Sequence, residues 1–359
     1  MTAGLTRGDR VPDFRRLDHK GEPQLLYDLH FGQPMTLFVF DSPETPDIRL
    51  ALDALGRDHP DWAQINRIAV VRGTPAQCAG LVNDESGAFA VLADDGTVTA
   101  HLLGFPPAGQ RLITAFALDS NLRIIERLEY SAGGNLDAFL QQVAAVYKRE
   151  APRSGQVCRQ QAPVLFIPRV LDALFCDELI AMFEKDGGQP SGVSYLEGDK
   201  ATWKPDPGVK IRRDLYLNEE HWIKRVREML MRRVLPEIQR CFNYQVTQHD
   251  PFKLICYDAE TGGYFRPHRD NESRDTLHRR FAMTINLNTG DYTGGQLRFP
   301  EFSTDLYEPE RGGAVIFSCS LLHEATNVTK GKRYALLSFL FGKSENVQPV
   351  QYQNAPAGR

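Results

Sequence analysis

The sequence predicts an α+β protein with two domains, and two observations support this. The first half alternates short apolar runs with stretches of helical periodicity, a pattern typical of a mixed α/β sheet. Between residues 252 and 341, five strand-like runs follow one another without a long helix between them. The length of 359 residues also fits two or three domains of ordinary size.

Residues 1–150 are expected to form the α/β domain. The apolar runs are continuous, as in strands that are buried on both faces. Thr74 can cap a helix whose first position is Pro75. In chain order we expect strands at 35–40 and 67–72, a helix from Thr74, strands at 113–119 and 122–128 joined by a turn at Ser120 and Asn121, and a helix from 135 to about 148.

This first half resembles a peroxiredoxin of the thioredoxin fold. The likeness lies in residues 8–14, the strand at 35–40 and residues 89–96. In that family the peroxidatic cysteine follows a threonine by three positions, and after Thr45 this position holds Ile48. An isoleucine has no thiolate to attack a peroxide. The resemblance therefore implies a thioredoxin-like domain, and Ile48 implies that it is non-catalytic. A thiol peroxidase that uses Cys78 remains the alternative.

A polar segment at 151–162 is expected to link this domain to a second one at 163–345, and 346–359 to be a disordered tail. Helical periodicity predicts helices at about 176–185 and 219–242, and Pro236 should kink or end the second. Residues 187–209 are rich in Gly, Pro and Asp, which indicates a long loop or irregular hairpin over a site. Trp203 in this segment is a candidate substrate contact or a loop anchor.

The density of strands after residue 252 predicts a jelly-roll, also called a double-stranded β-helix. The expected strands lie at about 252–257, 281–288, 296–299, 313–319 and 334–341.

Composition limits the function. Hydrophobic residues make up 42% of the chain and charged residues 25%, as in soluble globular proteins. A net charge of −4 gives no basic surface for nucleic acid. No apolar run is long enough for a membrane span and the first ten residues contain no signal-type apolar region, so we expect a cytoplasmic protein. The six cysteines contain no Cys-x-x-Cys pair and are expected to be buried thiols; two of them, Cys256 and Cys319, fall on strands of the second domain.

The candidate site is centred on His268 and Asp270. Side chains two apart on a strand point the same way, so this pair can act together, and His323 follows at the end of a later apolar run. Two imidazoles and one carboxylate are the ligand set of non-haem Fe(II) oxygenases. Taken singly, the first pair could be an exposed ion pair and His323 a core histidine. Arg333 opens the last strand, where a buried guanidinium could hold a dicarboxylate.

Together these residues resemble the prolyl-4-hydroxylase-type branch of the 2-oxoglutarate/Fe(II) dioxygenases. The motifs are His268-x-Asp270, the run 294–300, His323 and Arg333, and the likeness covers roughly 164–343. It implies Fe(II), 2-oxoglutarate and O2, and allows ascorbate. It also implies iron bound by the His–Asp–His set, 2-oxoglutarate bound by Arg333 and Tyr257, and release of succinate and CO2 on hydroxylation of a C–H bond. A structural core tyrosine is the alternative for Tyr257, and Thr284 and Asn286 are candidate substrate contacts.

We therefore expect a dioxygenase that hydroxylates a small molecule of the amino-acid or natural-product type. A peptidyl-prolyl hydroxylase and a 2-oxoglutarate-sensing scaffold without turnover are the alternatives. The expected partners are a small-molecule substrate and a second copy of the chain in a homodimer, with no nucleic acid and no membrane.

Overall fold

The computed structural model divides the chain into two compact units, Met1–Gly155 and Gln156–Arg359. It describes residues 4–29, 32–45, 47–56, 62, 65–82, 89–104, 112–131, 133–149, 155, 157–197 and 200–343. The predicted tail at 346–359 lies outside these residues, and the predicted domain limits stay predictions. No helix among the described residues is long and apolar enough to cross a membrane.

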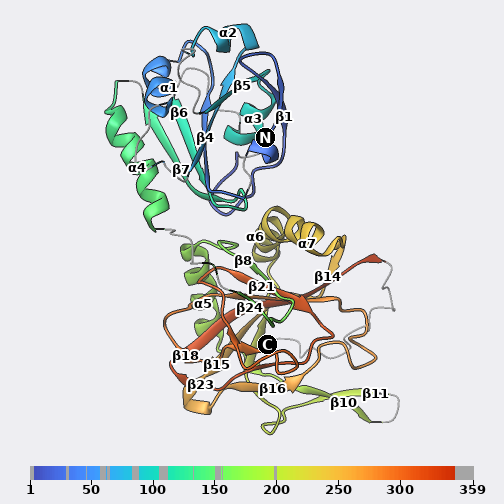
Figure 1. Ribbon diagram of the computed structural model, residues 1–359. Helices are drawn as coiled ribbons and strands as arrows, with labels where there is room; N and C mark the ends of the chain where they lie inside the picture. The colour runs from blue at the N-terminus through green and yellow to red at the C-terminus, as the bar shows by residue number, and fades with distance from the viewer. Residues whose placement is uncertain are drawn as a thin grey trace. The chain divides into compact units, whose positions relative to one another are not determined.

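The first unit is a seven-stranded sheet with helices on both faces (Figure 1). Its strand order is β2-β1-β5-β4-β3-β6-β7, and the central strands β3, β4 and β5 run parallel. The strands are β1 (Arg15–Asp18), β2 (Pro23–Leu25), β3 (Met35–Phe40), β4 (Asn66–Arg72), β5 (Ala90–Asp94), β6 (Leu112–Leu118) and β7 (Ile124–Ser131). The helices are the 3-10 turn η1 (Leu26–Leu29), α1 (Ile48–Gly56), α2 (Pro75–Ala79), α3 (Thr97–Leu103) and α4 (Leu136–Arg149).

Strand β3 shows why the apolar runs of this unit are continuous. Phe38 and Phe40 pack into one core cluster with α1 and α4, whereas Leu37 and Val39 pack into another with α3. Since both faces of the strand are buried, every position along it is apolar. Thr74 caps α2 through a reciprocal bond pair with Gln77, as its sequence indicates. The predicted mixed α/β sheet is confirmed.

The second unit is built from two antiparallel sheets. The larger has the order β8-β21-β17-β24-β15-β13-β9, with β14 also paired to β24, and the smaller has the order β12-β16-β22-β19-β20. The hairpin β10–β11 and the pair β18–β23 complete the strands. This is the predicted jelly-roll arrangement.

The strands of this unit are short apart from β24. They are β8 (Leu165–Ile167), β9 (Gln189–Pro190), β10 (Val193–Glu197), β11 (Lys200–Lys204), β12 (Lys210–Ile211), β13 (Arg213–Tyr216), β14 (Gln248–His249), β15 (Lys253–Asp258), β16 (Tyr264–His268), β17 (Phe281–Asn286), β18 (Thr293–Gly294), β19 (Leu297–Arg298), β20 (Leu306–Tyr307), β21 (Ala314–Ser318), β22 (His323–Ala325), β23 (Val328–Lys330) and β24 (Lys332–Phe341).

Most helical segments of this unit pack on the outer face of the larger sheet, namely α5 (Ala173–Asp186), α6 (Glu220–Met229), the π-helical segment η3 (Leu230–Val234) and α7 (Leu235–Phe242). The 3-10 turn η4 (Ala259–Thr261) follows β15, and its Ala259 packs against the inner core. Successive side chains of β24 point alternately into two hydrophobic cores, one on each face of the larger sheet. Leu336 and Leu340 face the helices, whereas Leu337 and Phe339 face the smaller sheet. The space between the sheets is thus lined by one face of β24, the face to which Arg333 belongs.

One detail differs from the sequence prediction. The helix predicted for 219–242 is interrupted by the π-helical segment, after which Pro236 stands in the first turn of α7. Pro236 has no N–H to donate, so a changed hydrogen-bond pattern just before it keeps the chain helical. The segment 187–209 contains the short strand β9 and the hairpin β10–β11, the irregular hairpin that was one of the two options.

Candidate metal centre

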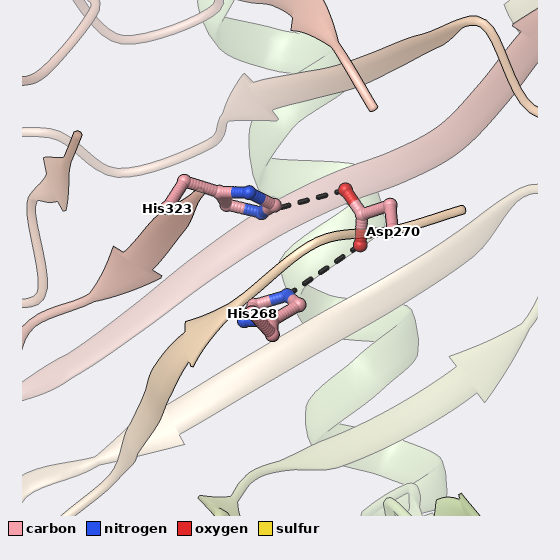
Figure 2. Close-up of side chains that lie close together, drawn as sticks. All are labelled: His268, Asp270 and His323. Carbon is pink, nitrogen blue, oxygen red and sulfur yellow. Dashed lines mark ion pairs between the residues drawn. The ribbon is translucent and has the colours of Figure 1, made fainter. Parts of the chain in front are cut away.

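His268, Asp270 and His323 meet where β16 ends and β22 begins, on two neighbouring inner strands of the smaller sheet (Figure 2). His268 is the last residue of β16 and His323 the first of β22, and the two are directly opposite in the strand register. Asp270 follows β16, where its N–H donates to the carbonyl of Cys319 at 2.9 Å. The period-two argument therefore places the first pair correctly, and strand pairing adds the second histidine.

The three side chains converge on one point. The Nε2 atom of His268 is 3.5 Å from one oxygen of Asp270, and the Nε2 atom of His323 is 3.4 Å from the other. One ligand atom from each residue lies within 4.8 Å of the others. This spacing suits coordination of a single ion by three residues.

The hydrogen bonds of the two imidazoles show that a cation fits here. The Nδ1 atom of His268 is 2.7 Å from the carbonyl of Arg266, and that of His323 is 3.0 Å from the carbonyl of Leu321. A carbonyl only accepts, so each neutral ring carries its proton on Nδ1 and turns the lone pair of Nε2 toward Asp270. Two lone pairs and a carboxylate facing one another need a positive charge between them.

Burial tunes the same residues for metal binding. Burial lowers the pKa of His323 to about 4, so its imidazole is neutral at neutral pH. For Asp270 burial acts in the opposite sense, yet its pKa lies below the usual value because a proton on His323 or His268 is attracted to its carboxylate. A divalent metal replaces such a proton and binds neutral imidazoles together with an ionised carboxylate.

Neighbouring charges fix the strand ends that carry the ligands. Glu301 accepts two N–H groups of Arg269, at 2.6 and 3.2 Å, and the backbone N–H of Leu322 at 3.0 Å. One carboxylate thus joins the segment between His268 and Asp270 to the turn before His323. Sequence reasoning missed Glu301, because nothing local distinguishes it from an exposed charge.

A cavity of about 290 Å³ extends from the His–Asp–His group into the space between the sheets. Its lining residues include Tyr257 and Arg333, the candidate cosubstrate contacts, and Thr284, a candidate substrate contact. Arg333 is buried, with its Nη2 donating to Asn286 at 2.9 Å, its guanidinium 5.6 Å from the ring centroid of Tyr257 and its Nε without a hydrogen-bond partner. No carboxylate of a described residue lies within 4 Å of it. A buried cation in this state needs an anion from a ligand.

The candidate substrate contact Asn286 takes a different position from Thr284. Asn286 does not line the cavity; its side chain lies behind Arg333, where its amide group also donates to Thr289 and Tyr292. It therefore orients the guanidinium, because that contact uses its carbonyl oxygen. The side chain of Trp203 lies outside the described residues.

The cysteines lie apart from the ligand set. Cys256 faces the helices in the outer core of the larger sheet. Cys319 is buried in the inner core, where burial raises the pKa of its thiol, and it contacts Asp270 through its backbone carbonyl. In the first unit, Ile48 opens α1 with its side chain in the core, and burial raises the pKa of Cys78 to about 11.

Sequence reasoning also missed a group of charged residues on the opposite side of the cavity. Lys210, Arg212 and Lys253 line it, and Asp214 pairs with two of them. A signal was present in the alternation Lys210-x-Arg212-x-Asp214, which puts three charges on one face of a strand-like segment. Only the pairing of that segment with β15 and β16 shows that the face is internal.

The part of the chain that contains His268, Asp270 and His323 is similar to known proteins. Residues 252–341 match the model of the 2OG-Fe(II) oxygenase superfamily. Procollagen-lysine,2-oxoglutarate 5-dioxygenase of Drosophila melanogaster is 23% identical over 203 residues, 54% of this chain and 26% of that protein. A multifunctional procollagen lysine hydroxylase and glycosyltransferase of Caenorhabditis elegans is 26% identical over 191 residues, 51% of this chain and 25% of that protein. The chain thus spans about a quarter of the length of these relatives.

Two solved structures resemble the two halves. A prolyl-4-hydroxylase of Pseudomonas putida covers 51% of this chain and 94% of its own, with 17% identity and a TM-score of 0.39. Peroxidoxin BcpB of Mycobacterium tuberculosis covers 42% of this chain and 99% of its own, with 23% identity and a TM-score of 0.36.

Proposed function

We propose that the protein is a 2-oxoglutarate- and Fe(II)-dependent hydroxylase with His268, Asp270 and His323 as its metal ligands, because residues 252–341 match the model of the 2OG-Fe(II) oxygenase superfamily. The observation that best supports this proposal is the geometry of the three ligands. The Nε2 lone pairs of His268 and His323 and the carboxylate of Asp270 face one another across a gap that fits a cation. A set of three protein ligands leaves coordination positions for a chelating cosubstrate and O2.

The residues of this chain have separate roles in that reaction. Arg333 binds the far carboxylate of 2-oxoglutarate, and Asn286 orients its guanidinium. Tyr257 lines the cavity beside it. Bound Fe(II), together with 2-oxoglutarate and O2, supplies the oxidising chemistry that converts a C–H bond into C–OH. The buried walls exclude bulk water from the reacting atoms.

For the substrate, the matched relatives favour a peptide-bound residue over the small molecule that the sequence suggests. Their names assign them lysine residues of procollagen. We therefore place a lysyl or prolyl residue of a peptide first and a free amino acid second. The second candidate is supported by the modest cavity of about 290 Å³, whose walls carry buried charges.

The direct test is iron-dependent succinate formation. The full chain, loaded anaerobically with Fe(II) and then given O2 and 2-oxoglutarate, should form succinate. The rate of succinate formation should rise when a peptide or amino acid that the protein hydroxylates is added. His268→Ala, Asp270→Ala and His323→Ala should each bind little iron and form no succinate above background, because three ligands leave none to spare.

The exposed His221 provides a matched control, since His221→Ala should retain both iron and turnover. Near-normal iron content in any of the three ligand variants would contradict the assigned metal site. A wild-type protein that binds iron and 2-oxoglutarate but forms no succinate would favour the sensing scaffold.

A further inference from the structure

Three cationic side chains line one side of the cavity, away from Arg333. Lys210 is 6% exposed and Arg212 8%, and the side chain of Lys253 is 13% exposed. They come from β12, from the residue before β13 and from β15. Such burial is uncommon for charged side chains unless each has a partner of opposite charge.

These cations share a single carboxylate. Asp214 accepts from the Nε of Arg212 at 2.6 Å and from its Nη2 at 2.8 Å, and it lies 3.6 Å from the Nζ of Lys253. No carboxylate of a described residue lies within 4 Å of the Nζ of Lys210. That ammonium donates to the carbonyl of Gly192 at 2.5 Å, which uses one of its three N–H groups. Three basic side chains on this side of the cavity therefore have one carboxylate among them, and Lys210 is the one that does not contact it.

Lys210 is also close to the metal ligands. Its Nζ lies 4.8 Å from the ring centroid of Phe265, and the Phe265 ring stacks on His268 with 3.4 Å between centroids. The ammonium is thus separated from a metal ligand by one aromatic ring. Burial, with Arg212 nearby, lowers the pKa of Lys210 to about 6, so a bound anion would restore its charge.

The cosubstrate does not account for these charges. One carboxylate of 2-oxoglutarate matches Arg333 and the other would lie at the metal. Arg333 is held separately by Asn286 on the far side of Tyr257. Arg212 contacts the near side of the same tyrosine, with its Nη1 donating to the hydroxyl at 3.4 Å. Lys210, Arg212 and Lys253 therefore line the part of the cavity that the substrate would enter.

We propose that the substrate of this hydroxylase carries a carboxylate, which Lys210 binds in the cavity beside Arg212 and Lys253. This inference rests on the proposed function and deepens it, since it defines a chemical class of substrate. The carboxylate can be the main-chain carboxylate of an amino acid or C-terminal residue, or the side chain of an acidic residue. Both sources present the same group to the ammonium.

The test uses the full chain loaded with Mn(II) and saturating 2-oxoglutarate, so that no turnover occurs. Three N-acetylated probes of one size are compared: N-acetylglutamine with a main-chain carboxylate, N-acetylisoglutamine with a side-chain carboxylate, and the neutral N-acetylglutamine amide. Relaxation of the acetyl methyl protons by Mn(II) reports binding near the metal. We expect at least one acid to show about tenfold more relaxation than the neutral amide, and the better acid identifies the source.

Lys210→Met should reduce the relaxation of that acid to the level of the amide, because methionine keeps the apolar stem without the charge. Lys210→Arg should retain most of the effect. Lys330→Met, at an exposed lysine of β23, should behave as wild type. Binding of Mn(II) and 2-oxoglutarate, measured first for each protein, verifies that the cavity is intact.

Equal relaxation by acids and amide, or an acid effect that survives in Lys210→Met, would overturn the carboxylate proposal. Either result can occur in a protein that binds metal and forms succinate, so it leaves the proposed function standing. Conversely, failure to bind metal or 2-oxoglutarate at all would contradict the proposed function itself.

Discussion

At the scale of single residues, the contrast between Arg333 and Lys332 shows how one strand separates two kinds of charge. Arg333 points into the cavity and is 2% exposed, whereas the Lys332 side chain is 44% exposed and forms ion pairs with Glu184 and Asp258 at 3.7 and 3.8 Å. Alternation along β24 requires this difference. The buried cation is therefore the one with a ligand to bind.

Replacing Arg333 should weaken 2-oxoglutarate binding without removing the metal. A charge-assisted hydrogen bond contributes about 1.5–3 kcal/mol, which corresponds to roughly a ten- to hundredfold increase in the dissociation constant. Titration of the Mn(II)-loaded Arg333→Met variant with 2-oxoglutarate measures this, with Lys330→Met as the control for loss of a lysine-type surface charge. An unchanged dissociation constant would mean that another cation holds the cosubstrate.

The residues that sequence alone could locate are those whose partners are set by local periodicity. His268 and Asp270 share a face because they are two apart, and Arg333 joins an apolar alternation that marks an inner strand face. Lys210 and Arg212 have no such mark. They are buried because β12 pairs with β16 and β13 pairs with β15, and both partners are far away in the sequence. From the sequence alone, such charges are expected to lie in a solvated loop.

At the scale of elements, the two glycines before β19 allow the smaller sheet to pass close to β23 and β24. Gly294 has φ +80°, and a Cβ atom there would be 2.1 Å from the carbonyl oxygen of Asn327. Gly295 has φ +73°, and its Cβ would be 3.0 Å from the Cδ of Arg333. Glycine is the residue that permits both the backbone conformation and the close approach.

Gly294→Ala should therefore destabilise the protein more than the backbone conformation alone explains. Positive φ costs about 1–3 kcal/mol for a residue with a side chain, and the clash adds to it. Gly262→Ala is the matched control, since Gly262 has φ +72° with nothing within 4 Å of the added Cβ. Urea unfolding of the two variants measures the difference, and equal losses would show that the chain relaxes around the clash at no cost.

Helices and strands that are long and periodic were predicted correctly from the sequence. The prediction failed for elements that are short or whose bounds depend on backbone pairing. The periodic helix α4 and the apolar strand β24 have nearly the bounds expected from the sequence. The short strands β12, β16 and β22, which build the site, have few residues in which a pattern can develop. The π-helical segment could not be predicted from the sequence either, because its register depends on how the helix packs against the sheet.

At the scale of the whole molecule, each unit has its own core, and only the second holds a group of metal-ligating residues among those described. In the first unit, the position three residues after Thr45 holds Ile48, whose N–H donates to the carbonyl of Thr45 at 3.2 Å. An isoleucine at this position has no thiolate to attack a peroxide.

We expect this unit to have no thiol peroxidase activity. Cys78 is the single cysteine of residues 1–150, it is 0% exposed, and a pKa of about 11 leaves very little of it as thiolate at neutral pH. Hydrogen peroxide consumption by the full chain with dithiothreitol should equal that of the reductant alone, and Cys78→Ser should not change it. To keep iron chemistry out of the measurement, the metal is removed and Asp270→Ala serves as a second background. Peroxide reduction that disappears in Cys78→Ser would show that burial of this thiol is relieved in solution, and the first unit would then be a second catalytic centre.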